Sequence, residues 1–166
     1  MQSFKQWIPM VSYPEMDTVN AILSIEKNGS APLNGFIDFV SQTTLTDLQE
    51  KYTQTFDMNP GTCLDLGWHL YGEAYERGAF MLKIRELLRD QGHTESKELP
   101  DHLSHILAAL DGLDPEDQKP MVNQFIQPAL TKILDGFQET DNPFQFVIQY
   151  LDEQLKRQFG TVEESD

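Results

Sequence analysis

The sequence predicts an all-α protein, a single-domain helical bundle of about six to seven helices. Apolar side chains recur at spacings of three and four residues over most of the chain, which is the period of an amphipathic helix. Asn-Gly, Asp-Pro and Asn-Pro pairs separate these stretches and mark helix ends. With 166 residues, 39% of them apolar, the chain has the size of one domain with its own core. We therefore expect one helical domain over 1–166, with an irregular leader at 1–11 and a disordered tail at 160–166.

Three short helices are expected before residue 57. Ser12, with Glu15 three residues later, has the spacing of a capping box and predicts a helix that ends near residue 28. A second helix is expected over 33–41, and Thr44 with Asp47 predicts the start of a third. The apolar stripes of the three helices consist of Val19, Ile22 and Leu23, of Leu33, Phe36, Ile37 and Val40, and of Leu45, Leu48 and Tyr52.

The central element of the prediction is one long helix over 63–91. Its start is indicated by an Asn-Pro-Gly turn and by Thr62, which lies three residues before Asp65 and predicts a second capping box. Gly92 is a typical residue after a helix end. Two successive apolar rows support the helix, namely Leu64, Trp68, Tyr71, Tyr75, Ala79 and Leu82, followed by Phe80, Ile84, Leu87 and Leu88.

Three polar residues of this helix, Asp65, His69 and Glu73, fall at four-residue steps and would share one stripe. The stripe has three interpretations: a solvated polar face, a metal site of a helical metal-binding protein or enzyme, or a recognition surface for a peptide. A metal site needs further ligands from other segments, for which His102 and His105 are candidates. A di-metal bundle needs a second Glu-x-x-His copy, which the chain lacks. We therefore predict no metal and no cofactor.

The polar run at 93–97 has no helical period and is expected to be a mobile loop and a candidate hinge. Pro100 fits the first turn of the next helix, where a missing amide donor costs nothing. His102 and His105, one turn apart, are expected to be surface or capping histidines. The buried stripe of this helix consists of Leu103, Ile106, Leu107 and Leu110.

Two more helices complete the prediction. An Asp-Pro-Glu step at 114–116 is a strong helix start and predicts a long apolar-faced helix to about residue 137. Pro128 should kink this helix, because its ring crowds the preceding turn and it lacks an amide donor. An Asn-Pro step at 142–143 predicts the start of the last helix.

Composition and motifs argue against several classes of function. Twenty-seven acidic and twelve basic residues give a formal net charge of −15, which argues against a nucleic-acid partner. Such a field attracts cationic peptides, although it also serves solubility. Cys63 is the only cysteine, so an intramolecular disulfide is excluded, as is usual in the cytoplasm. No signal peptide or transmembrane segment is visible, and we expect a cytoplasmic protein. Phosphate-binding, nucleophile-elbow and zinc motifs are absent, so we predict no enzyme.

Three segments, taken in order, resemble one family. They are Tyr52-Thr53-Gln54-Thr55-Phe56-Asp57, LDLGWHLYGEAYERG at 64–78, and Glu98-Leu99-Pro100-Asp101-His102-Leu103. Together they are similar to the nitrate reductase assembly chaperones, NarJ-like members of the wider TorD/DmsD group that mature molybdenum enzymes. An Asn-Pro-Phe step at 142–144 is also similar to the start of the family's last helix. The resemblance extends over about residues 51–151.

The resemblance implies a non-catalytic, all-helical chaperone. Its partner would be the N-terminal segment of the catalytic subunit of a molybdenum oxidoreductase, a segment that is twin-arginine-like in exported clients. The chaperone would hold that subunit while its cofactors are installed, before membrane attachment or export. The expected groove lies between the central helix, the end of the third helix and segment 98–102. The candidate client-binding residues are Tyr52, Phe56, Asp57, Trp68, His69, Tyr71, Glu73, Glu76, Arg77, Glu98, Leu99, Pro100, Asp101 and His102.

Arg77 has two interpretations within this scheme. It can pair with an acid of the Leu-Pro-Asp segment at 99–101 and tie that segment to the central helix, or it can form an ordinary local salt bridge beside Glu73 and Glu76. Two alternatives to the chaperone remain, namely the metal-binding protein and a generic acidic adaptor for basic helices. The oligomeric state is also open between a monomer and a dimer swapped through the loop at 93–97.

Overall fold

The computed structural model describes residues 3–138 and 141–160, and it confirms the all-α class. In this part of the chain nine α-helices are joined by a 3-10 helix (η1) and two π-helical turns (η2 and η3), without a named strand. The elements are, in order, η1 (Phe4–Val11), α1 (Met16–Leu23), α2 (Ala31–Gln42), α3 (Leu45–Tyr52), η2 (Thr53–Asp57), α4 (Leu66–Tyr71), α5 (Tyr75–Asp90), α6 (Leu103–Asp111), α7 (Pro115–Met121), η3 (Val122–Ile126), α8 (Gln127–Gly136) and α9 (Pro143–Phe159).

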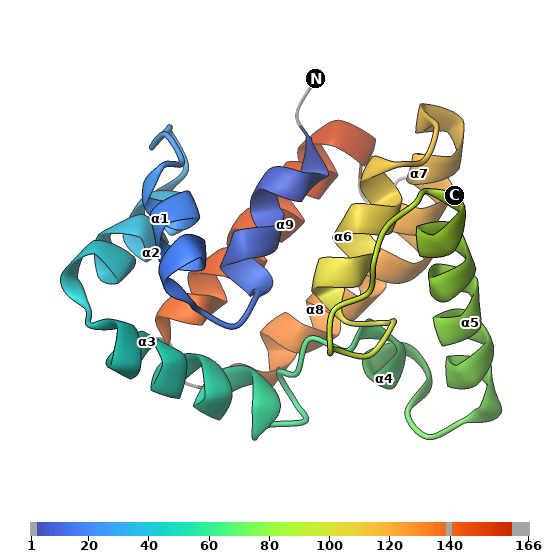
Figure 1. The fold of residues 1–166 in the computed structure, drawn as a ribbon, viewed down its shortest axis with the longest axis horizontal. Helices are drawn as coiled ribbons and strands as arrows, with labels where there is room; N and C mark the ends of the chain where they lie inside the picture. The colour runs from blue at the N-terminus through green and yellow to red at the C-terminus, as the bar shows by residue number, and fades with distance from the viewer. Residues whose placement is uncertain (1–2, 139–140, 161–166) are drawn as a thin grey trace.

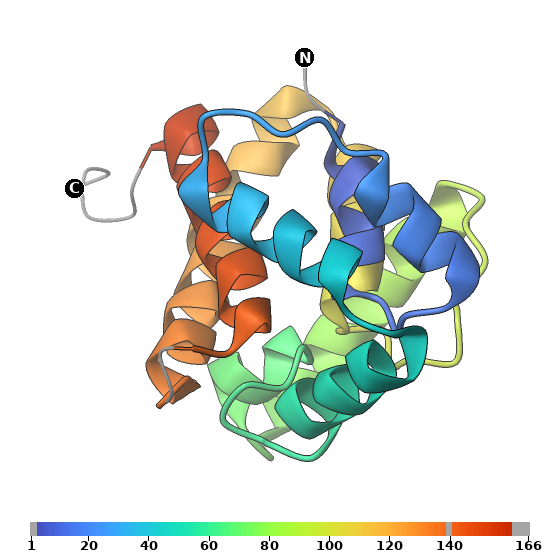
Figure 2. The same ribbon diagram turned by 90° about the vertical axis from the view of Figure 1, so that its left-hand side faces the viewer.

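Two helices from distant parts of the sequence run through the middle of the bundle. In Figure 1, α1, α2 and α3 lie on one side of η1 and α9, and α4 to α8 lie on the other. Helix α9 packs on both α2 and α8, and η1 packs on α6 and α1. Figure 2 shows the same arrangement from the side of the N-terminal helices, with η1 in front of α6. One apolar core therefore connects the two sides.

The leader expected to be irregular is a 3-10 helix, so this prediction is wrong. Its apolar side chains Phe4, Trp7 and Met10 are all buried, and they recur every three residues, which is the 3-10 period. The carboxylate of Asp111 in α6 accepts hydrogen bonds from the amide of Phe4 at 2.8 Å and from the hydroxyl of Ser3 at 2.9 Å. Helix η1 is thus part of the core.

The third helix begins as predicted, the second begins two residues earlier than predicted, and the first begins later. Thr44 caps α3 by accepting a hydrogen bond from the amide of Asp47 at 3.1 Å. Ser12, in contrast, is no cap, because its hydroxyl donates to the carbonyl of Ile8 at 2.7 Å. Helix α1 starts only after Glu15 and ends at residue 23.

The predicted long central helix is two helices, α4 and α5, joined by a turn at 72–74. Gly72 has φ +60°, a conformation that glycine adopts without strain, and its amide donates to the carbonyl of Trp68 at 2.8 Å. The predicted capping box also fails. Thr62 is buried and donates its hydroxyl to the carbonyl of Thr55, while Asp65 at the N-cap makes no side-chain cap bond.

The C-terminal helices follow the predicted order with different boundaries. Helix α6 begins at residue 103, so Pro100 lies before it, and His102 is its cap, accepting from the amide of Ser104 at 3.2 Å. The helix predicted from 114 is divided by η3, a π turn directly before α8, and the irregularity therefore precedes Pro128. Asn142 caps α9 as predicted, accepting from the amide of Phe144 at 3.0 Å.

Two further expectations concern the ends and the membrane. Of the tail predicted to be disordered, residues 161–166 lie outside the described part of the chain. Among the described helices, none combines the length and the apolar content that crossing a bilayer requires.

Candidate functional site

The three segments that resemble the chaperone family meet in space. The amide of Leu66 donates to the carbonyl of Asp101 at 2.9 Å, and the amide of Leu103 donates to the carbonyl of Leu64 at 2.9 Å. These two bonds form an antiparallel bridge between Asp65 and His102. The start of α4 is thereby held against the segment that leads into α6, and η2 lies next to both around one cavity.

A buried ion pair fixes the same junction. The side chain of Asp101 is fully buried, and its two oxygens accept from Nε of Arg77 at 3.0 Å and from Nη2 at 3.4 Å. Asp65 adds a second carboxylate 3.7 Å from the guanidinium. Arg77 therefore ties the Leu-Pro-Asp segment to α5, and the alternative of a local salt bridge with Glu73 or Glu76 is wrong.

The close approach of α4 to this pair requires a glycine. A Cβ at Gly67 would lie 2.5 Å from Oδ2 of Asp101 and 3.0 Å from Cγ of Arg77. Both contacts are shorter than van der Waals separation, and Asp101 has no free space to move into because it is buried. The Leu-Gly step at 66–67 is thus explained by the ion pair behind it.

A cavity of about 260 Å³ opens beside the bridge. We call it the acidic pocket, because Asp57, Asp65 and Glu98 line it together with the apolar side chains of Phe56 and Leu64. The full lining consists of Phe56, Asp57, Cys63, Leu64, Asp65, Lys97, Glu98, Leu99 and His102. The residues come from η2, from the chain before α4 and from the segment before α6.

The three carboxylates of the acidic pocket repel one another, and Lys97 is the cation among the lining residues. Burial raises the pKa of Asp65 to about 6, and repulsion from the charges of Asp101 and Glu98 raises it further, against the opposing effect of Arg77. Burial also raises the pKa of Glu98, with repulsion from Asp57 as the second cause. The pKa of Asp57 is raised by burial, against the opposing effect of Lys97. A cation entering the pocket would relieve this repulsion.

Two histidines near the pocket are neutral hydrogen-bonding groups. Burial lowers the pKa of His102 to about 3. Its Nδ1 accepts from the amide of Ser104, so Nε2 carries the proton and donates to Glu98 at 3.2 Å. Burial also lowers the pKa of His69, whose Nε2 lies 2.7 Å from the carbonyl oxygen of Cys63. His69 therefore holds the chain before α4 and is not part of the pocket lining.

The predicted client-binding residues divide into three groups. Phe56, Asp57, Glu98, Leu99 and His102 line the acidic pocket. Tyr52, Arg77, Pro100 and Asp101 are buried or half-buried outside the lining, and Tyr52 is a core residue whose hydroxyl donates to the carbonyl of Val11 at 2.9 Å. Trp68, His69, Tyr71, Glu73 and Glu76 are not among the lining residues, and the last two are exposed.

Cys63, Leu64 and Lys97 line the acidic pocket but were not predicted as site residues. The sequence placed Cys63 and Leu64 inside the long central helix, but α4 begins only at Leu66. Lys97 was placed in a mobile loop. Lys97 also borders a second cavity, of about 360 Å³, which shares Glu98 and His102 with the first. The ammonium of Lys97 lies 6.0 Å from the ring centre of Tyr13 on that side. The polar run at 93–97, between two predicted helices, was the feature of the sequence that could have pointed to Lys97 as an exposed site residue.

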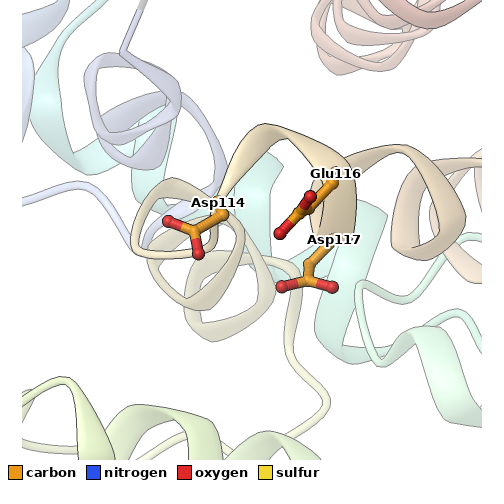
Figure 3. A group of neighbouring side chains, drawn as sticks. All are labelled: Asp114, Glu116 and Asp117. Carbon is orange, nitrogen blue, oxygen red and sulfur yellow. The ribbon is translucent and has the colours of Figure 1, made fainter.

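The metal-site interpretation of Asp65, His69 and Glu73 is not supported by their positions. Asp65 faces Arg77, His69 is bonded to a backbone carbonyl, and Glu73 lies exposed in the turn after α4. In the described residues, carboxylates gather instead at the start of α7, where oxygens of Asp114, Glu116 and Asp117 lie within 4.8 Å of one another (Figure 3). All three of those side chains are exposed.

Known proteins similar to this chain match it over the part of the sequence that holds these segments. The family model described as nitrate reductase delta subunit matches residues 25–147, which include the whole lining of the acidic pocket. Two curated relatives, the nitrate reductase molybdenum cofactor assembly chaperones NarJ of Escherichia coli K12 and O157:H7, are each 26% identical over 136 residues. The alignment covers 81% of this chain and 57% of theirs, so the chain spans little more than half their length.

A solved structure is similar over nearly the full chain. It belongs to a protein from Archaeoglobus fulgidus proposed to be a redox enzyme maturation protein, with a TM-score of 0.67 and 21% identity. The match covers 92% of this chain and 91% of that one. At this identity the similarity concerns the fold. With the family match, it confirms the resemblance found in the sequence.

Proposed function

The chain belongs to the nitrate reductase delta subunit family, and from this membership we propose that it is an assembly chaperone for a molybdenum oxidoreductase related to nitrate reductase. Its client would be the N-terminal segment of the catalytic subunit. The names of the curated relatives, which are molybdenum cofactor assembly chaperones, support the role, as does the absence of an enzyme motif from the sequence. The protein would act by binding and not by catalysis.

The observation that carries this proposal is the acidic pocket. Three partly desolvated carboxylates, Asp57, Asp65 and Glu98, line a cavity together with a few apolar side chains, which include Phe56 and Leu99. A guanidinium or ammonium group would lower their mutual repulsion, and an apolar neighbour in the client could rest on Phe56 and on the exposed side chain of Leu99. A short segment with one basic and one apolar anchor fits these features.

We further propose that binding precedes membrane attachment or export and takes place in the cytoplasm. A client whose N-terminal segment lies in the pocket cannot present that segment to another receptor at the same time, because the two bound states exclude each other. Occupation of the pocket would thus delay transport until the cofactors are in place.

The test is calorimetric titration with synthetic N-terminal segments, each of roughly 30 residues, from the molybdoenzyme catalytic subunits encoded in the same genome. We expect submicromolar affinity for one of them, and weaker binding at high salt because the contact is between charges. Glu98→Gln and Asp57→Asn should weaken the interaction. Glu153→Gln, an exposed acid on α9, is the matched control and should not.

Two results would contradict the proposal. If no N-terminal segment binds, the client contact lies elsewhere. If an unrelated basic helix binds as tightly as the best segment, the protein is a general acidic adaptor, and its net charge of −15 would be the cause.

A further inference from the structure

A second groove lies on a different part of the molecule, between α5 and the α7–η3 segment. Its cavity is about 300 Å³, and its lining includes Lys83, Leu87, Leu113, Asp117, Met121 and Phe125. None of these residues lines the acidic pocket. In Figure 1, α5 and α7 lie at the opposite end of the molecule from α3, the helix that leads into η2. We call this second site the α5–α7 groove.

The floor of the α5–α7 groove is apolar and only partly covered. Leu87, Leu113 and Phe125 are half-buried, and Met121 is 5% exposed. Phe125 is fixed from below by Phe80, with ring centres 5.1 Å apart. Leu87 on α5 and Met121 and Phe125 on the α7–η3 segment thus leave an apolar strip between the two walls, which a third helix could cover.

The two walls of the groove run antiparallel. At one end the ammonium of Lys83 lies 5.2 Å from the ring centre of Phe125. At the other end, Gln91 directly follows α5 and donates to the carbonyl of Ala109 in α6 at 3.0 Å. Leu113, the first residue of the opposite wall, comes four residues after Ala109. At a rise of 1.5 Å per residue, the α7–η3 wall is roughly 15 Å long from Pro115 to Phe125, or about three helical turns.

The two ends of the groove carry opposite charge. Asp117 belongs both to the lining and to the carboxylate cluster with Asp114 and Glu116 (Figure 3). Acids in a first helical turn favour the helix, but Asp114 occupies the N-cap position without a cap hydrogen bond. In the described part of the chain, none of the three carboxylates forms an ion pair. Three repelling charges are therefore left at one end, and the cation Lys83 stands at the other.

We propose that the α5–α7 groove docks a short amphipathic helix of a partner protein that carries basic residues in its first turn. These basic residues would face Asp114, Glu116 and Asp117, and apolar residues at helical spacing would cover the floor. The negative C-terminal end of the partner helix would then lie toward Lys83, so the helix dipole favours the same direction. The inference rests on this groove alone and holds whether or not the acidic pocket binds a client.

Direction and charge can be tested together with three labelled synthetic peptides of about 12 residues, long enough for three turns. They share one leucine face at helical spacing and differ in charge: Arg in the first turn, the same Arg in the last turn, or Glu in the first turn. Fluorescence anisotropy with the full chain should show binding in this order, with about a tenfold loss between the first and second peptides.

Charge reversal of the cluster should reverse the order. In the double variant Glu116→Lys and Asp117→Lys, the peptide with Glu in its first turn should bind best. Both residues are exposed, so the fold should tolerate the change, which circular dichroism would verify. The matched control, Glu50→Lys with Glu153→Lys, changes the net charge equally at exposed positions outside the groove and should keep the original order.

Four outcomes would overturn the proposal. Equal affinity for the three peptides would show that the groove does not select charge. An equal effect of the control variant would show that net charge alone attracts the peptide. Amide resonance shifts at Phe56 and Glu98, instead of at Leu113 to Phe125, would place the peptide in the acidic pocket. If Leu87→Lys converts a dimer to a monomer in sedimentation, a second copy of the chain occupies the groove.

Discussion

Arg77 and Asp101 form a two-point ion pair in which the carboxylate is fully buried and the guanidinium side chain is 20% exposed. The pair joins α5 to the segment before α6, and it stands directly behind the lining of the acidic pocket. Its neighbour Asp65 reaches the same guanidinium from the pocket side, at 3.7 Å. One arginine thus serves both a structural carboxylate and a carboxylate of the candidate site.

Removing Arg77 should therefore be costly. Arg77→Ala leaves the buried Asp101 without a counter-charge, and we expect the free energy of unfolding to fall by about 3–5 kcal/mol in urea titrations. Arg85→Ala is the matched control, because Arg85 pairs with Glu95 across the surface with a side chain 48% exposed. That variant should lose less than about 1 kcal/mol. Equal losses in the two variants would show that burial of the Arg77 pair has no energetic weight.

Tyr52 should behave as a core residue. Its ring is fully buried against Phe56 and Phe144, with ring centres 5.0 and 5.7 Å away. Tyr52→Ala should lower the free energy of unfolding by about 3–5 kcal/mol through the cavity it leaves. Tyr52→Phe removes only the hydrogen bond to Val11 and should cost about 1 kcal/mol. If Tyr52→Ala weakens client binding with unfolding unchanged, the side chain contacts the client after all.

Asp65 should make the protein less stable as the pH rises. The pKa of Asp65 is about 6 in the folded protein against an ordinary 3.8, so between these values the folded state binds the proton and the unfolded state does not. The free energy of unfolding therefore falls as the pH rises through this window, on the order of 2 kcal/mol. Asp65→Asn should lack this fall. The difference between variant and wild type, measured by urea unfolding across the window, should grow with pH and then level off.

His102 should have the opposite effect. Its pKa is about 3 in the folded protein against an ordinary 6.5, so between these values only the unfolded state binds the proton. The contribution to stability is complete above pH 6.5 and is lost as the pH falls toward 3, on the order of 5 kcal/mol. His102→Asn keeps a capping oxygen but cannot titrate. A variant with the same acid sensitivity as wild type would contradict a neutral, buried His102.

The helix ends that the sequence predicted correctly are those set by local chemistry. Thr44 and Asn142 cap the helices that follow them through bonds to residues two or three positions away. Such bonds need no other part of the fold, so the pattern is sufficient to find them. The same holds for Pro115, which takes the first position of α7.

The helix boundaries that were predicted wrongly are those set by contacts with segments distant in the sequence. Thr62 has a capping spacing, but it donates to Thr55, and the chain before α4 pairs with the segment at 101–103. The apolar rows at 64–88 continue across Gly72, so the periodicity alone could not show that the helix ends there. The acidic pocket shows the same division. Its family-like residues were found by resemblance, whereas Cys63 and Lys97 reach it through the tertiary fold.

The central position of α9 also determines the order in which the molecule can be completed during synthesis. Helix α2 packs on α9, and the rings of Phe36 and Phe144 lie 5.4 Å apart, yet more than a hundred residues separate these positions in the sequence. A ribosome must therefore release nearly the whole chain before α2 finds its partner. Until then Phe36 and Ile37, both buried in the finished fold, remain uncovered. The nascent chain should accordingly stay sensitive to protease until α9 has emerged, and then become resistant in a single step.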